Sequence, residues 1–178
     1  MSPVQTTQRV LARIDANDRA LFHRLALGVD AQRSVQRLWL TLTHLGGARA
    51  TILWCVVSVA LPMVSIALAW RALLCLGVSH AIVQVVKRCA GRPRPSARQG
   101  LVALIAAPDR YSFPSGHACA VMSVAAVYAA AFPTLALPLL VLALIVGCSR
   151  VVLGVHYPGD VVMGQAIALA TALVGSLW

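Results

Sequence analysis

Three short motifs, far apart in the sequence, contain residue types that bind phosphate and can attack it. They are residues 87–95 (KRCAGRPRP), 114–117 (PSGH) and 149–160 (SRVVLGVHYPGD). Lys87 is the only lysine of a chain in which 60% of the residues are hydrophobic. Charged residues beside apolar segments are costly and are usually functional. The three motifs therefore indicate a site for a phosphate group at a membrane.

The basic residues and the PSGH turn are suited to binding an anion. Arginine offers a planar set of donors that matches phosphate oxygens, and lysine supplies a compact positive charge. Residues 114–116 precede an apolar segment, so their backbone N–H groups would point at an anion at the start of a helix. Gly116 would let the backbone approach the phosphate closely.

Two histidines and one aspartate complete a set that can transfer the phosphoryl group. His156 and His117 are the candidates for nucleophile and proton donor. Asp160 follows His156 by four residues, so on a helix it would lie one turn away and hold one ring nitrogen. The other nitrogen would then be an oriented nucleophile, as in catalytic triads.

Each motif taken alone also has a simpler interpretation. Basic residues at 87–92 are typical of the positively charged flank of a membrane helix, and Ser115 after a proline often caps a helix. His156 and Asp160 could form a structural pair, and Arg150 could extend to the membrane surface. The joint occurrence of the motifs favours the catalytic interpretation.

The composition predicts an integral membrane protein. The 178 residues have a mean hydropathy of +0.81, and only 11% of them are charged, which lies outside the range of soluble domains. The formal net charge is +10. Because the chain is so apolar, this charge favours anionic headgroups or an anionic substrate as partners over nucleic acid.

Hydropathy predicts an all-α bundle with about five transmembrane helices. Residues 1–48 alternate arginines with apolar residues, which predicts amphipathic helices lying on the membrane surface, and the Gly46-Gly47 pair breaks the chain near their end. Residues 49–178 form the predicted transmembrane core. Its expected spans cover residues 50–70, 72–88, 115–132, 134–151 and 159–177.

These spans bring the three motifs to one face of the membrane. Lys87 ends the second span and Arg150 ends the fourth, whereas His117 begins the third and Asp160 begins the fifth. Two spans therefore end and two begin on the same side, and this convergence is stronger evidence for a site than any single motif.

With these motifs the chain resembles the type-2 phosphatidic acid phosphatase superfamily, which includes bacterial membrane lipid phosphatases and polyprenyl diphosphate phosphatases. The signature of that family is Lys-x6-Arg-Pro, then Pro-Ser-Gly-His, then Ser-Arg-x5-His-x3-Asp. The segments 87–95, 114–117 and 149–160 match it at every position. The resemblance covers about residues 50–177.

The resemblance implies a role for each matching residue. His156 would attack phosphorus and form a phosphohistidine, Asp160 would orient His156, and His117 would protonate the leaving oxygen and then activate water. Arg92 lies outside the signature and is expected only to support the site. No metal and no other cofactor is expected. The phosphate oxygens would be bound by Lys87, Arg94, Ser115, the Gly116 N–H and Arg150.

The resemblance implies a metal-independent phosphatase of a lipid phosphate, of the phosphatidic acid or phosphatidylglycerophosphate type. One alternative is a polyprenyl (undecaprenyl) diphosphate phosphatase, and a more remote one is a non-enzymatic anion-binding membrane protein. The expected partners are the lipid substrate and membrane lipids, with no nucleic acid and the oligomeric state left open.

The expected location is the inner membrane of a bacterium, crossed several times. Six arginines in residues 1–48 favour a cytoplasmic active-site face. In many bacterial relatives that face is extracytoplasmic, so the orientation stays open.

Overall fold

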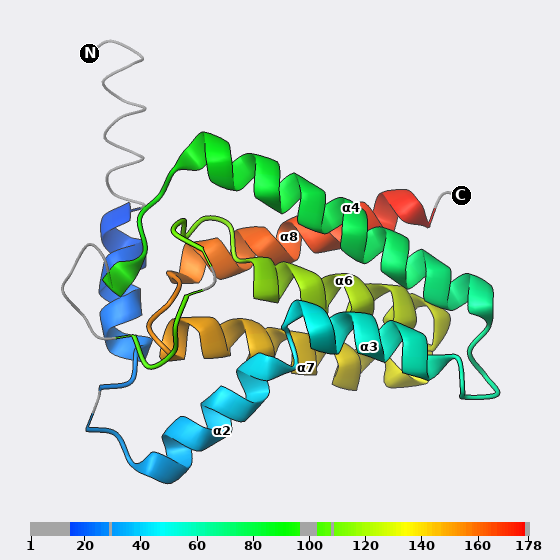
Figure 1. Cartoon of the computed structure of the whole chain (residues 1–178), viewed down its shortest axis with the longest axis horizontal. Coiled ribbons are helices and arrows are strands. Elements are labelled where there is room, and N and C mark those ends of the chain that lie inside the picture. Colours follow the sequence, from blue (N-terminus) through cyan, green and yellow to red (C-terminus); the bar gives the residue numbers. More distant parts are fainter. Residues whose placement is uncertain (1–14, 29, 97–102, 108, 177–178) are drawn as a thin grey trace.

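The computed structural model describes residues 15–28, 30–96, 103–107 and 109–176, so the first part of the predicted N-terminal region lies outside the described residues. Within them the chain is helical apart from turns, loops and one isolated bridge, which confirms the predicted all-α bundle. Five helices run side by side (Figure 1). They are α3 (Ala48–Ser58), α4 (Ile66–Ala90), α6 (Gly116–Ala131), α7 (Pro133–Val152) and α8 (Pro158–Gly175).

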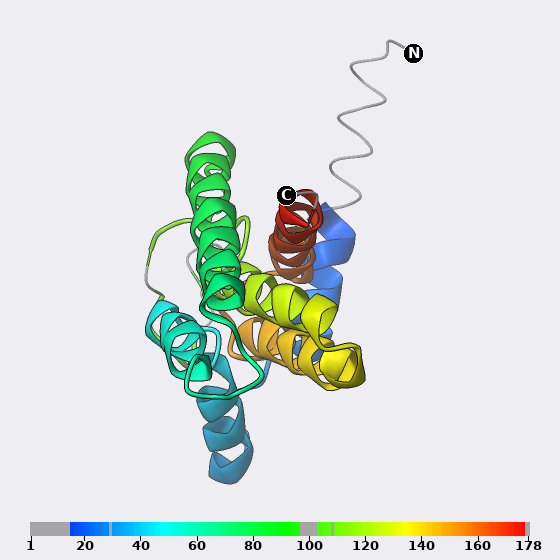
Figure 2. The same cartoon turned by 90° about the vertical axis from the view of Figure 1, so that its right-hand side faces the viewer.

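Helix α6 is the central helix of the bundle. Its side chains are buried from Ala118 to Ala125, and it contacts α4, α7, α8 and α3 (Figure 2). Two hydrogen bonds between hydroxyl groups add to the apolar packing: Ser123 with Ser79 of α4 at 2.7 Å, and Tyr128 with Ser58 of α3 at 2.6 Å. A helix that is apolar on all sides needs neighbours on all sides.

The outer helices expose apolar side chains, as a membrane protein requires. On α4 an exposed stripe recurs every fourth residue from Ile66 to Ile82. Among the described residues, α4, α7 and α8 are each long and apolar enough to cross a membrane. Helix α6, with 16 residues, is shorter. The protein is therefore an integral membrane protein.

The predicted first span over residues 50–70 is wrong. Helix α3 already ends at Ser58, and α4 begins at Ile66. Pro62 cannot donate a backbone hydrogen bond to a continuing helix. Ser65 then starts α4, because its side chain accepts from a backbone N–H in the first turn at 3.1 Å. The apolar stretch is thus two helices that run in opposite directions.

Helix α2 (Arg33–His44) precedes α3 and is separated from it by the predicted break at Gly46-Gly47. It has the predicted amphipathic pattern, because Val35, Leu38 and Leu42 recur at a helical spacing along one face. Helices α2 and α3 are together apolar enough for one span, but they meet at an angle of 59°. The division into an interfacial region and a core at residue 48 stays a prediction.

One end of the bundle collects the motifs, as predicted. Helices α4 and α7 end there, and α6 and α8 begin there. A further helix over residues 15–25 crosses the same end, at the left of Figure 1. Its Phe22 is fully buried and packs edge-on against Tyr157, with ring centroids 5.3 Å apart. The Leu27 N–H donates to the carbonyl oxygen of Val152 at 2.9 Å.

Close packing of α8 on the PSGH turn sets the geometry of this end. The Ser115 N–H donates to the carbonyl oxygen of Asp160 at 2.9 Å. A Cβ atom at Gly164 would lie 2.4 Å from the carbonyl oxygen of Ser115. Only glycine leaves room for this backbone contact.

We expect Gly164→Ala to push α8 away from the PSGH turn. The overpacking should lower the free energy of unfolding by about 1–3 kcal/mol. Gly175→Ala is the matched control on the same helix, because a Cβ atom there meets nothing within 4 Å. Thermal unfolding of both variants in detergent checks this, and equal stability of the two would contradict the packing argument.

Candidate active site

The structure brings most of the predicted site residues to one groove at the end of the bundle. The groove has a volume of about 590 Å³ and continues along α3 and α4, where Ile52, Leu73 and Leu76 line it. The predicted site residues that line the groove are Lys87, Arg94, Gly116, His117 and His156. They come from segments far apart in the sequence, so it is the fold that brings them together.

The loop between α4 and α6 carries the arginines of the first motif. Gly91 ends α4 in the left-handed conformation, with φ of 57°, which turns the chain sharply away from the helix. Two contacts then join the two sides of the loop. One is a bridge between Pro93 and Tyr111, and the other is a hydrogen bond from the Ser112 N–H to the Arg92 carbonyl oxygen at 2.8 Å. The two sides of the loop are thereby held at the mouth of the site.

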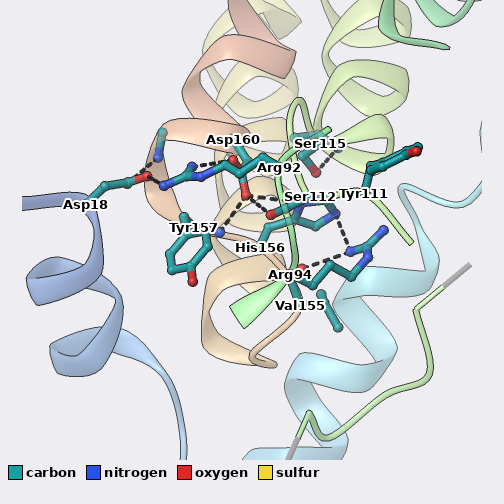
Figure 3. Close-up of polar contacts among 12 residues, drawn as sticks. Asp18, Arg92, Arg94, Tyr111, Ser112, Ser115, Val155, His156, Tyr157 and Asp160 are labelled. Carbon is teal, nitrogen blue, oxygen red and sulfur yellow. Dashed lines mark hydrogen bonds and ion pairs between the residues drawn. The ribbon is translucent and has the colours of Figure 1, made fainter. Parts of the chain in front are cut away.

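Arg94 lies against the candidate nucleophile. Its Nη1 is 3.1 Å from Nε2 of His156 and donates to the carbonyl oxygen of Val155 at 2.8 Å (Figure 3). Its Nε and Nη2 donate to the carbonyl oxygen and to the carboxylate of Asp109, at 2.7 and 2.8 Å. These contacts fix the guanidinium of Arg94 at the groove, with Nη1 beside His156 and the other two nitrogens on Asp109.

Asp109 pairs with two of the predicted phosphate-binding residues. One carboxylate oxygen accepts from Nη2 of Arg94, and the other accepts from Nζ of Lys87 at 2.7 Å. Burial raises the pKa of Asp109, but Lys87 and Arg94 outweigh this and hold the pKa below its ordinary value. The carboxylate presents two oxygens to these cations, as a phosphate would.

The carboxylate of Asp160 is placed near His156 because Asp160 caps the start of α8. His156 precedes α8, so the expectation that both residues share one helical turn is wrong. Asp160 is the third residue of α8, and its carboxylate folds back to accept from the Tyr157 N–H at 2.8 Å and from the Ser112 hydroxyl. This places one carboxylate oxygen 3.5 Å from Nδ1 of His156. That distance is longer than an ordinary hydrogen bond, so the contact is a loose one.

The surroundings of His156 keep its ring neutral. Burial lowers its pKa from 6.5 to about 4; Asp160 opposes this shift, and the cations of Arg94 and Arg150 add to it. A neutral ring carries one proton, and we assign it to Nδ1, which faces the Asp160 carboxylate. The lone pair of Nε2 then faces Arg94 and the groove.

Two predicted phosphate-binding residues are buried beside the groove but do not line it. The Ser115 hydroxyl caps α6 by accepting from the Ala118 N–H. Arg150 donates to the hydroxyl of Thr43 at 2.6 Å. Its Nε is buried without a hydrogen-bond partner among the described residues, so it has a donor to offer an anion. Their role in binding phosphate stays a prediction.

The family model of the PAP2 superfamily matches residues 68–178, which is more than half of the chain. The chain belongs to the PAP2 superfamily. It is 39% identical over 101 residues to decaprenylphosphoryl-5-phosphoribose phosphatase of Mycobacterium tuberculosis, covering 56% of this chain and 55% of that protein. It is 34% identical over 145 residues to phosphatidylglycerophosphatase B of Bacillus subtilis, covering 72% of this chain and 67% of that protein.

The fold agrees with that of solved PAP2 phosphatases. The crystal structure of Aquifex aeolicus LpxE aligns with a TM-score of 0.77 at 20% identity, covering 89% of this chain and 94% of that one. The chain spans about half the length of the mycobacterial relative that it matches.

Reasoning from the sequence missed several residues of this PAP2 site. Asp109 and Ser112 lie just before the PSGH motif, but a single acid and a single serine carry no recognisable spacing. Thr43, the partner of Arg150, lies more than a hundred residues away from it. Arg92, expected only to support the site, donates to the carboxylate of Asp160 at 2.6 Å. These contacts arise only from the tertiary fold.

We expect the imidazole of His156 to remain neutral as the pH falls through 6.5 and to protonate only near about 4, because the neutral form is favoured by burial. Histidine 15N NMR of the labelled protein in detergent checks this, with the His156 signals assigned by their loss in His156→Ala. The exposed His44 is the internal reference. Protonation of His156 near pH 6.5 would contradict this assignment.

We expect Asp109→Asn to bind inorganic phosphate several-fold more tightly than the wild-type protein. The variant lacks the negative charge that pairs with Lys87 and Arg94 in competition with phosphate. The affinity for phosphate is measured by the inhibition of turnover with added phosphate, or by calorimetry. Asp30→Asn removes the same charge from an exposed site and should leave the affinity unchanged. Equal affinities of wild type and Asp109→Asn would show that the carboxylate does not compete.

Proposed function

We propose that this protein is a membrane lipid phosphatase that removes the phosphate of a lipid phosphomonoester through a phosphohistidine at His156. The observation that carries the proposal is the arrangement around the His156 ring. Nδ1 faces the Asp160 carboxylate at 3.5 Å, while Nε2 faces the groove beside the guanidinium of Arg94 at 3.1 Å. This is the arrangement of an oriented nucleophile next to a cation that stabilises phosphate.

In the first step the lone pair of His156 Nε2 attacks phosphorus, and a P–N bond forms. The P–O bond to the lipid breaks, and its electron pair stays on the leaving oxygen, which takes a proton from His117. His117 enters this step as an imidazolium, because the phosphate dianion bound beside it favours the charged form. The positive charge that develops on the His156 ring is balanced by the Asp160 carboxylate beside Nδ1. Lys87 and Arg94 stabilise the charge on the phosphate oxygens, and for this they exchange Asp109 for the phosphate.

In the second step His117, now neutral, takes a proton from a water molecule as that water attacks phosphorus. The P–N bond breaks, and its electron pair returns to Nε2 of His156. Inorganic phosphate leaves, Asp109 pairs with Lys87 and Arg94 again, and both histidines regain their starting protonation states. His117 thus acts as acid in one step and as base in the other.

The shape of the groove supports a lipid substrate. Away from the charged end it is lined by Ile52 on α3 and by Leu73 and Leu76 on α4. Ile52 is exposed, so this part of the groove reaches the protein surface between the two helices. A lipid phosphate can enter from the bilayer through this opening, with its tail against the apolar residues and its phosphate among the cations.

The activities for which the relatives are named support the same class of substrate. They are a decaprenylphosphoryl-5-phosphoribose phosphatase and a phosphatidylglycerophosphatase. Both names describe removal of a phosphate from a phosphate ester of a lipid, which favours a phosphomonoester over a diphosphate. We place the protein in the inner membrane of a bacterium, since these relatives are bacterial proteins.

The test is phosphate release by the purified full-length protein in detergent with EDTA present. We expect phosphate from phosphatidic acid or phosphatidylglycerophosphate, and less from undecaprenyl diphosphate. His156→Ala should lower kcat by at least about a thousandfold, since loss of a covalent nucleophile removes the pathway. His44→Ala, at an exposed histidine, is the matched control and should retain full activity.

Thermal unfolding of His156→Ala shows whether the variant is folded. Undiminished turnover in that variant would exclude the phosphohistidine mechanism. Loss of wild-type activity in EDTA would show that a metal is needed.

A further inference from the structure

Arg92 joins the N-terminal helix of residues 15–25 to the start of α8. Its Nη1 donates to one carboxylate oxygen of Asp160 at 2.6 Å. Its Nη2 lies 2.7 Å from the carboxylate of Asp18 and 2.9 Å from that of Asp15, both on the N-terminal helix. Figure 3 shows Asp18, Arg92 and Asp160 in a line that leads to His156.

Asp18 makes a second contact with α8. Its other carboxylate oxygen accepts from the Gly159 N–H at 2.7 Å, in the first turn of the helix. A Cβ atom at Gly159 would lie 3.0 Å from the Asp18 carboxylate, so only a small residue allows this approach. Together with the buried Phe22 ring against Tyr157, the contact holds the N-terminal helix on α8.

We propose that Asp18 is a positioning residue of the active site, which acts through Arg92 to fix the Asp160 carboxylate that orients His156. This inference rests on the proposed function. Asp18 lies outside the segment that the family model matches, residues 68–178. The catalytic unit of this protein therefore includes part of the N-terminal region.

The contacts of Asp160 explain why Arg92 matters. The carboxylate is fully buried, and a buried carboxylate is stable only when it is paired and hydrogen-bonded. Arg92 binds one of its oxygens, while the Ser112 hydroxyl and the Tyr157 N–H bind the other. The oxygen held by Ser112 and Tyr157 is also the one that faces His156. A shift of Arg92 would therefore rotate the carboxylate relative to the imidazole.

The acidic residues of the N-terminal helix keep Arg92 in place. Arginine has a long side chain with many rotamers, and its planar guanidinium is fixed only when partners hold both ends of the fork. Asp160 holds one end, and Asp18 and Asp15 hold the other, while the Tyr157 ring lies 4.2 Å from the guanidinium carbon. Burial lowers the pKa of Arg92, but these carboxylates outweigh it and raise the pKa, so Arg92 stays charged.

The substitution Asp18→Asn separates the two contacts of Asp18. An asparagine oxygen can still accept from the Gly159 N–H, so the contact with α8 is kept. The negative charge of Asp18 that attracts Arg92 is lost, while Asp15 and Asp160 keep theirs. Arg92→Gln removes the guanidinium itself, and Asp30→Asn is the control for loss of one exposed acid. The double variant with Asp18→Asn and Arg92→Gln tests whether both residues act in one chain.

The experiment follows the first turnover of the full-length protein with 32P-labelled phosphatidic acid in saturating excess, quenched in base to preserve phosphohistidine. The rate constant of its formation reports the chemistry of folded molecules, and the amplitude reports the folded fraction. We expect Asp18→Asn to lower the rate constant about tenfold and Arg92→Gln about a hundredfold, as small misplacements of catalytic groups do. The amplitude and the KM should stay as in the wild type.

The double variant should be no slower than Arg92→Gln alone, because Asp18 acts through Arg92. A wild-type rate constant in Asp18→Asn would overturn the inference, as would a lower amplitude at an unchanged rate constant. Independent, multiplicative effects in the double variant would overturn the path through Arg92. Absence of phosphohistidine in the wild-type protein would instead refute the proposed function.

Discussion

The buried carboxylate of Asp160 is the constraint on which the rest of the site depends. An ionised carboxylate inside an apolar bundle is tolerated only if donors surround it. Here the donors are Arg92, the Ser112 hydroxyl and the Tyr157 backbone N–H, with His156 next to them. Each comes from a segment whose position follows from this requirement: the loop after α4, the turn before α6 and the chain that enters α8. The candidate nucleophile is oriented by the same contacts that stabilise the charge.

The balance of charge around the groove follows from the same principle. Lys87 and Arg94 are buried cations, and without a bound anion they would repel each other in an apolar setting. Asp109 lies between them and pairs with both, so its negative charge offsets their repulsion. The carboxylate of Asp109 is partly exposed, whereas that of Asp160, at the start of a packed helix, is fully buried.

Reasoning from hydropathy and spacing recovered most of the architecture because those features are local. The ends of α6, α7 and α8 lie close to the predicted boundaries, since prolines, small residues and charges mark them in the sequence. The break between α3 and α4 was missed because the segment is apolar throughout. There, one proline and one serine cap outweigh hydropathy.

The sequence by itself determined the chemistry of this protein: an apolar chain with three motifs whose spacings match a known signature, at the ends of helices that must meet on one face. Residue types and local periodicity are sufficient for this. Only the tertiary structure decided the partner of each charged side chain. Three pairs join loops and helices that no spacing rule connects: Asp109 with Lys87, Thr43 with Arg150, and Asp18 with Arg92. A buried charge takes the nearest partner in space, and that partner is set by the packing of the whole bundle.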